Sequence, residues 1–139
     1  MTWVFVLAID RVAPEALTAS APLLVVCLCA EWCGVCRDYR SSFAQVTAAV
    51  QADHPQAQFV WLDIEDDADL LHPLDDVDDF PTLLVAVASV PRFFGPLTPQ
   101  PQTLERLVRS LAENPSARPL AEPALRAAVA RILATRAAA

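Results

Sequence analysis

The chain has 139 residues and a formal net charge of −7 at pH 7. This length fits one domain with its own core, and the acidic balance argues against a nucleic-acid partner. No apolar run reaches the ~18 residues that a membrane span needs. The apolar start, Met1 to Ile9, lacks the basic residues and the small-residue cleavage site of a secretory signal. We therefore expect a cytoplasmic protein that contacts neither nucleic acid nor a membrane.

The first half of the chain predicts alternating strands and helices. Residues 3–9 are rich in β-branched and aromatic side chains, as strands are, and residues 12–19 predict a short helix. The run 23–29 is apolar throughout, which is typical of a strand buried on both faces in a mostly parallel sheet. Helical spacing then predicts a long helix over 34–52, and a further strand follows over 58–64.

Two cysteines, Cys33 and Cys36, stand where the apolar strand meets the long helix. The unpaired N–H groups and partial positive charge of a helix N-terminus favour a thiolate on the first of them. The second lies one helical turn further on, close enough to form a disulfide. The apolar face of this helix is predicted to hold Tyr39, Phe43, Val46 and Val50. The spacing therefore predicts thiol–disulfide chemistry.

The same C-x-x-C spacing is also half of a zinc site. A tetrahedral site needs four ligands, and neither a suitably spaced histidine nor a second C-x-x-C completes the set. Two further cysteines, Cys27 and Cys29, lie in the buried-strand pattern rather than in a ligand loop. We expect no metal.

The second half begins with an acidic segment that includes Asp75, Asp76, Asp78 and Asp79. This charge run is either a solvated face or the rim of a substrate groove. A short helix is predicted over 66–72, a strand over 82–88, and a tight connection over 89–91. Thr98 and Pro99 are predicted to cap a helix. The inward stripe of that helix is Leu104, Leu107, Val108 and Leu111.

The C-terminal segment divides into a linker and a last helix. Residues 114–121 have the composition of a linker, and Pro123 starts a helix over 122–137. The apolar side of this helix carries Leu125, Val129, Ile132 and Leu133. The helix either packs back on the domain or serves a dimer or partner contact. We divide the chain into a domain over 1–113 and an extension over 114–139.

Two motifs give the sequence its resemblance to a known family. The first is Ala30-Glu31-Trp32-Cys33-Gly34-Val35-Cys36, and the second is Phe80-Pro81-Thr82 followed by an apolar strand. With these motifs, residues 3–113 resemble the thioredoxin family. The resemblance implies an α/β thioredoxin fold with a central mixed β-sheet flanked by helices, here with an extra C-terminal helix. It also implies a cis peptide bond at Pro81, beside the cysteines.

The resemblance further implies a thiol–disulfide oxidoreductase that reduces or exchanges protein or peptide disulfides. Cys33 would be the nucleophile, and Cys36 would close the redox-active disulfide Cys33–Cys36. No cofactor is implied, and the electron donor is not identified. By the same resemblance, the substrate-binding residues would be Trp32, Gly34, Phe80, Pro81, Thr82 and Gly95.

Three positions depart from the family pattern. Cys27 falls at the family's buried aspartate, Trp61 falls at its lysine, and Val35 replaces its proline. Cys27 and Trp61 are therefore candidate modulators. Cys27 is either a small buried hydrophobe or a third thiol that exchanges with Cys36. Strand alternation puts Cys27 and Cys29 on one face, and we do not expect them to bridge each other.

These departures keep a rival function open. A thioredoxin-fold binding or assembly-chaperone module would dock its partner on the acidic groove or on the C-terminal helix. The intact cysteine pair favours the enzyme over this rival.

Overall fold

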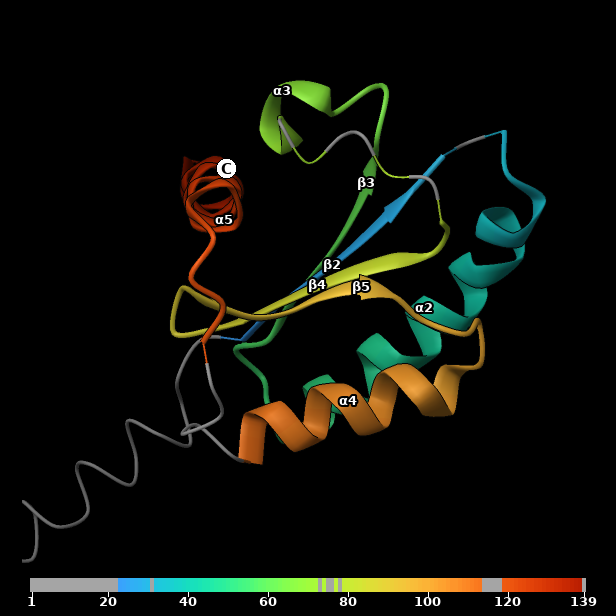
Figure 1. Ribbon diagram of the computed structural model, residues 1–139. Coiled ribbons are helices and arrows are strands. Elements are labelled where there is room, and N and C mark those ends of the chain that lie inside the picture. Colours follow the sequence, from blue (N-terminus) through green and yellow to red (C-terminus); the bar gives the residue numbers. More distant parts are fainter. Residues whose placement is uncertain are drawn as a thin grey trace, which may run out of the picture.

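The computed structural model describes residues 23–30, 32–72, 74, 77, 79–113 and 119–138, with side chains to Thr135 (Figure 1). The strand predicted over 3–9 and the helix predicted over 12–19 lie outside the described residues. So do Glu31 and the three aspartates Asp75, Asp76 and Asp78.

The described strands form a four-stranded mixed sheet in the order β3-β2-β4-β5. The central strands are β2 (Leu23–Cys29) and β4 (Thr82–Val87), and the outer ones are β3 (Gln58–Asp63) and β5 (Val90–Pro96). The β2–β3 pair is parallel, whereas the β2–β4 and β4–β5 pairs are antiparallel. Every residue of β2 and β4 is buried, which explains the unbroken apolar runs 23–29 and 83–87. The predicted mixed sheet is confirmed, but the mostly parallel pairing that the run 23–29 suggested is not found among the described strands, where two of the three pairs are antiparallel.

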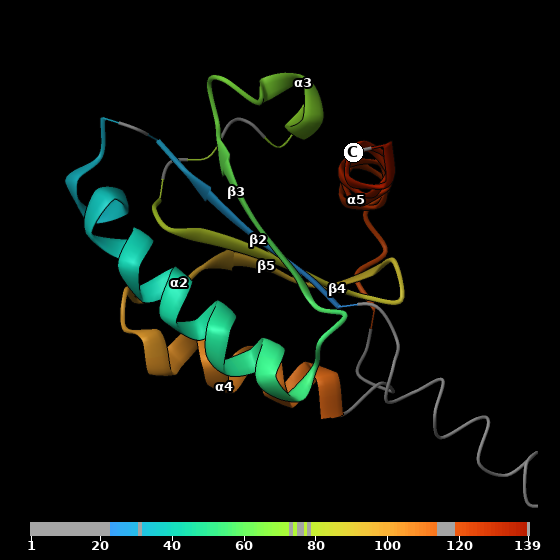
Figure 2. The same ribbon diagram turned by 180° about the vertical axis from the view of Figure 1, so that it is seen from behind.

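Helices cover both faces of this sheet, as Figures 1 and 2 show. On one face, α2 (Gly34–Asp53) and α4 (Pro101–Glu113) pack side by side. On the other, α5 (Pro123–Ala138) contacts β5 and the short helix α3 (Ala68–Leu71). The alternation of side chains along the strands divides the core into two layers. Cys27, Cys29 and Cys36 belong to the layer under α2 and α4.

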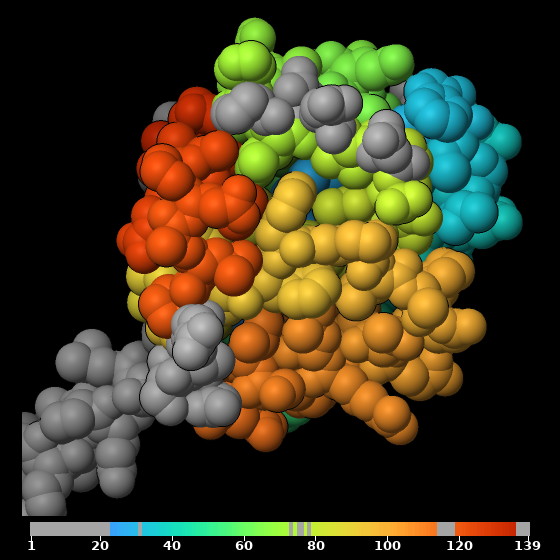
Figure 3. All heavy atoms as spheres, in the orientation of Figure 1, coloured from blue at the N-terminus to red at the C-terminus, as the bar shows by residue number. Residues whose placement is uncertain are grey.

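The C-terminal helix packs back on the domain, so this alternative is confirmed. Its buried side chains are Leu125, Ala128, Val129 and Ile132. Arg131 extends from α5 to the end of α3, where its Nε donates to the Leu70 carbonyl over 3.1 Å and its Nη2 donates to the His72 carbonyl. The extension therefore completes the second layer of the core. Figure 3 shows α5 and α4 on either side of β5 at the surface.

Three predicted boundaries are wrong. The strand predicted to end at residue 88 ends at Val87, because Ala88 and Ser89 form the turn with φ of 53° and 70°. The helix predicted over 66–72 is only α3. The next helix begins at Pro101, where a proline suits the first turn. Thr98 instead pairs its hydroxyl with that of Thr103, 3.1 Å away.

Candidate functional site: cysteines beside the cis-proline loop

Cys33 occupies the N-cap position of α2 with an extended backbone, φ −87° and ψ 122°. Its N–H donates to the Ala30 carbonyl over 3.0 Å, which closes the turn between β2 and α2. The Cys33 side chain is half-buried, and the neighbouring Trp32 is 64% exposed. The strand-to-helix turn therefore presents Cys33 near the surface.

The second motif forms a loop that leads into β4. The Phe80–Pro81 peptide bond is cis, as the resemblance implied. The Pro81 carbonyl accepts a hydrogen bond from the Leu97 N–H over 3.1 Å, and the Thr82 hydroxyl donates to the Asp79 carbonyl. These bonds hold the loop against the end of β5.

The two motifs meet through their aromatic residues. The Trp32 and Phe80 rings lie edge to face, with centroids 5.7 Å apart and an interplanar angle of 87°. This arrangement is one that aromatic pairs prefer. The predicted neighbours Trp32, Cys33, Phe80 and Pro81 therefore lie together at one end of the sheet.

The two glycines have more space around their Cα atoms than the family motif suggests. Gly95 pairs with Leu83 in the β4–β5 ladder, next to Thr82. A Cβ at Gly95 would lie 3.7 Å from the Phe93 ring, and a Cβ at Gly34 would lie 3.8 Å from the Arg37 side chain. Both are ordinary contacts, so neither glycine is required by close packing there.

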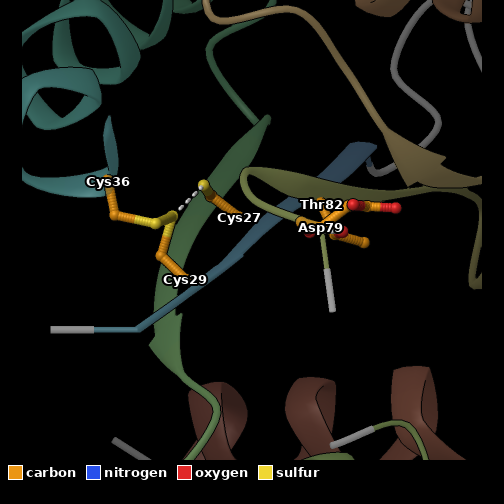
Figure 4. The surroundings of a disulfide bond; sticks show 5 residues. All are labelled: Cys27, Cys29, Cys36, Asp79 and Thr82. Atoms are coloured by element: carbon orange, nitrogen blue, oxygen red, sulfur yellow. Dashed lines mark hydrogen bonds between the residues drawn. A yellow bond between two sulfur atoms is a disulfide. The ribbon is translucent and has the colours of Figure 1, made fainter. Parts of the chain in front are cut away.

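The disulfide differs from the predicted one. Cys36 is bonded to Cys29, with their Cα atoms 5.8 Å apart (Figure 4). Cys33 is free. The predicted Cys33–Cys36 bond is therefore wrong for this structure. The reason is the direction of the side chains. Cys36 points inward from the first turn of α2 and is 1% exposed, and Cys29 points to the same layer from the end of β2.

Cys27 lies one step deeper than this bond. Its Sγ is 3.7 Å from the Cys29 Sγ, and they form a hydrogen bond rather than a bridge (Figure 4). Because the Cys29 sulfur carries no proton in the disulfide, the Cys27 thiol is the donor. Burial raises the pKa of the Cys27 thiol far above its usual range, while the charge of Arg40 acts in the opposite direction. Cys27 therefore stays protonated at neutral pH.

Trp61 lies beside Cys27, because the two residues pair in the β2–β3 register. The Arg40 guanidinium, from α2, lies 4.7 Å from the centre of the Trp61 ring, and Phe43 meets the same ring edge to face. A positive charge therefore stands near the thiol, but on a different element from the family's lysine. Sequence reasoning missed Arg40, although its place one turn after Cys36 on α2 was a usable signal.

Another polar group is buried in the same layer. Tyr39 is 1% exposed, and its hydroxyl has no hydrogen-bond partner among the described residues. Burial raises the pKa of the Tyr39 hydroxyl far above its usual range, and the nearby Cys27 thiol acts in the same direction. The Cys27 thiol and the Tyr39 hydroxyl, both buried in this layer, therefore stay protonated and neutral.

A cavity of about 210 Å³ opens beside the disulfide. Its lining includes Cys36, Arg37, Arg40, Trp61, Asp63 and Asp67. This mixture of cations, carboxylates and an indole gives the site a polar opening beside Cys36.

The described residues contain neither a metal-binding cluster nor a membrane-spanning helix. Within them, no group of three or more histidine, cysteine, aspartate or glutamate side chains is arranged to hold a metal ion. No helix in that part of the chain combines the length and apolarity needed to cross a membrane. Of the acidic residues proposed to rim a groove, Asp79 is described and exposed.

A mixed sheet between helical layers, with a strand–cysteine–helix turn facing a cis-proline, defines a thioredoxin-type protein. The thioredoxin family model matches residues 10–96, more than half of the sequence, so this chain belongs to the thioredoxin family. Proteins of this family use no cofactor. No curated protein matches the sequence.

Solved structures show the same fold. Mitochondrial thioredoxin 3 from Saccharomyces cerevisiae, in its oxidised form, aligns with a TM-score of 0.55 and 21% identity over 73% of this chain and 90% of its own. The oxidised thioredoxin of Plasmodium falciparum aligns with a TM-score of 0.52 and 17% identity, over 73% and 91%. The zinc-bound form of human ERp44 aligns with 0.56 and 16%, over 73% of this chain. This chain covers only 30% of ERp44.

Proposed function

We propose that this protein is a thiol–disulfide oxidoreductase that acts on protein or peptide disulfides. The observation that carries the proposal is the contact between Trp32 and Phe80, with ring centroids 5.7 Å apart. It joins the turn that presents the half-buried Cys33 to the loop that holds cis-Pro81. A substrate disulfide that reaches Cys33 therefore also meets the loop.

The reaction transfers two electrons from a protein dithiol to the substrate. The Cys33 thiolate attacks one substrate sulfur, breaks the substrate disulfide and releases the other sulfur as a thiolate. Cys36 then attacks the Cys33 sulfur of the mixed disulfide, so that the second substrate sulfur leaves and Cys33–Cys36 forms. The cycle begins from a chain in which the Cys29–Cys36 bond has been reduced, because Cys36 must be a thiol.

The hydrogen bonds of the loop suggest where a substrate backbone would lie. The Pro81 carbonyl is already used by the Leu97 N–H, and Thr82 is part of β4. We therefore place an extended substrate along Phe80, with Trp32 covering its side. The cytoplasmic location and the acidic rim of the groove remain predictions.

The test is reduction of insulin disulfides with dithiothreitol as the electron source. We expect turnover by the wild type, a fall to the uncatalysed rate for Cys33→Ser, and accumulation of mixed disulfides for Cys36→Ser. Ser110→Ala, on the exposed side of α4, is the matched control and should keep the wild-type rate. Full activity in both cysteine variants would show the proposal to be wrong.

The rival function, a binding or assembly-chaperone module, has one observation in its favour. Cys36 is bonded to Cys29, so the C-x-x-C pair is open in this structure. Against it, the apolar side of α5 is used in the core and cannot serve as the docking face. Insulin reduction separates the two functions, because the rival predicts no turnover by the fully reduced wild type.

A further inference from the structure

We propose that Cys29 is a third redox-active cysteine. After each round of disulfide reduction, it replaces Cys33 as the disulfide partner of Cys36. This inference rests on the proposed function, and it names a residue that the C-x-x-C motif does not contain. The oxidised chain would then hold its disulfide between the end of β2 and α2, with Cys33 left as a thiol near the surface.

The geometry makes Cys36 the shared partner. Cys36 is the third residue of α2, one turn from Cys33 at the N-cap, so Cys33 is its neighbour within the helix. Cys29 is its neighbour across the layer, at a Cα separation of 5.8 Å that suits a disulfide. Because Cys36 can bond only one of them at a time, the two disulfides exclude each other.

The exchange step needs no outside oxidant. The Cys29 thiol loses its proton to solvent, and its sulfur attacks the Cys36 sulfur of the Cys33–Cys36 bond. The Cys29–Cys36 bond forms as the Cys33–Cys36 bond breaks, and Cys33 leaves as a thiolate. One disulfide is present before and after the step, so no net oxidation occurs.

The two strand cysteines are both buried, and the hydrogen bond between them assigns them different roles. Cys27 and Cys29 are separated by one residue on an extended strand, where the side chains run parallel and do not bridge. The Cys27 thiol stays protonated and donates a hydrogen bond to the Cys29 sulfur, 3.7 Å away. This hydrogen bond stabilises negative charge on Cys29, which is the charge that the attacking sulfur carries. Cys27 is thus a positioning residue.

The exchange changes what Cys33 can do next. With Cys36 held by Cys29, a mixed disulfide at Cys33 has no resolving thiol beside it. The Cys33 thiolate of the oxidised chain therefore attacks a second disulfide, releases one of its sulfurs as a thiolate and retains the other in a mixed disulfide. A chain limited to Cys33–Cys36 would retain nothing, since both cysteines would already be bonded.

Peptide mapping tests this on the wild-type protein. Cleavage after glutamate and arginine, at Glu15, Glu31 and Arg37, gives two fragments that carry the cysteines. Fragment 16–31 holds Cys27 and Cys29, and fragment 32–37 holds Cys33 and Cys36. The reduced protein receives one equivalent of hydroxyethyl disulfide, and samples are unfolded in acid with N-ethylmaleimide to stop exchange. We expect a bond within fragment 32–37 first, and then its conversion to a bond between the two fragments.

Three variants identify the sulfurs involved. In Cys27→Ala, the bond between the fragments should persist, and the maleimide should be found on Cys33 in fragment 32–37. In Cys29→Ser, the bond between the fragments should be lost. In Cys33→Ser it should form at least tenfold more slowly, because its precursor is missing. A wild-type disulfide that stays within fragment 32–37 would overturn the proposal. So would an unchanged rate in Cys33→Ser.

The peptide-mapping result and the insulin-reduction result test the exchange and the proposed function separately. If insulin is reduced but no bond forms between the fragments, the exchange fails and the oxidoreductase stands. If the bond between the fragments forms through Cys33 but insulin is not reduced, the oxidoreductase fails and the internal exchange remains.

Discussion

The guanidinium of Arg40 lies 4.7 Å from the centre of the Trp61 ring, and this contact joins α2 to β3 next to the buried thiols. Such a contact contributes about 0.5–1 kcal/mol at a partly exposed site. It also places a cation where its charge opposes the effect of burial on the pKa of Cys27. Trp61 occupies the position where the resemblance implied a lysine, and the nearby positive charge comes instead from Arg40 on α2.

Removal of this cation should therefore weaken the fold near the thiols. We expect Arg40→Gln to lower the free energy of unfolding by about 0.5–1 kcal/mol in urea denaturation. Arg106→Gln, an exposed change on α4, is the control and should stay within about 0.5 kcal/mol of the wild type. Equal effects of the two changes would mean that the contact with Trp61 contributes nothing to stability.

The protonated Cys27 predicts a loss of stability in alkali. Its ordinary pKa is 9.0, and burial raises it in the folded state. Above pH 9 the unfolded chain therefore loses a proton that the folded chain keeps, so the unfolded state is favoured as pH rises. The stabilisation is fully present below pH 9. Above it, we expect a loss of about 1.4 kcal/mol per pH unit from this group.

The measurement is urea denaturation of the oxidised protein at several values between about pH 7 and pH 10. Cys27→Ala should show a shallower decline above pH 9, by about the same 1.4 kcal/mol per unit, and the same slope as the wild type below pH 8. An identical alkaline decline in both proteins would mean that Cys27 ionises as readily in the folded state as in the unfolded chain.

The packing of α5 predicts that the extension is part of the folding unit. Ile132 packs into the core against the sheet and is only 1% exposed. Ile132→Ala should therefore lower the free energy of unfolding by about 2–4 kcal/mol in urea denaturation. Arg126→Ala, on the exposed side of the same helix, is the control and should cost less than about 0.5 kcal/mol. A dimer formed through this apolar side would instead make the Ile132→Ala effect depend on protein concentration.

The turn between β4 and β5 predicts a stabilising change. Ala88 and Ser89 both have positive φ, the pair of conformations that a two-residue hairpin turn favours but that residues other than glycine adopt at a cost. We expect Ser89→Gly to raise the free energy of unfolding by about 0.5–1 kcal/mol.

A matched glycine elsewhere separates this effect from a general one. Ser110→Gly lies in the interior of α4, where glycine is unfavourable, and should destabilise the protein by about 0.5 kcal/mol. If Ser89→Gly destabilised the protein as Ser110→Gly does, the positive φ at residue 89 would not describe the turn in solution.

The pattern of residues along the chain predicts the central strands and the long helix, whereas the meeting of the two motifs was implied by the family resemblance. Unbroken apolar runs over 23–29 and 83–87 require burial on both faces, and the structure covers both faces with helices. The apolar stripe of α2 is buried as its spacing predicts. These features are local, because the period of the apolar residues reports directly which side of an element faces the core.

Tertiary contacts, by contrast, determine which sulfur Cys36 bonds, where α5 packs, and which cation lies beside Trp61. Sequence spacing singles out Cys33 as the partner of Cys36, since both lie in one motif. A disulfide, however, forms between side chains that point toward each other, and Cys29 acquires that direction only when β2 packs under α2. Likewise, Arg40 meets Trp61 across two elements whose approach no pattern along the chain encodes.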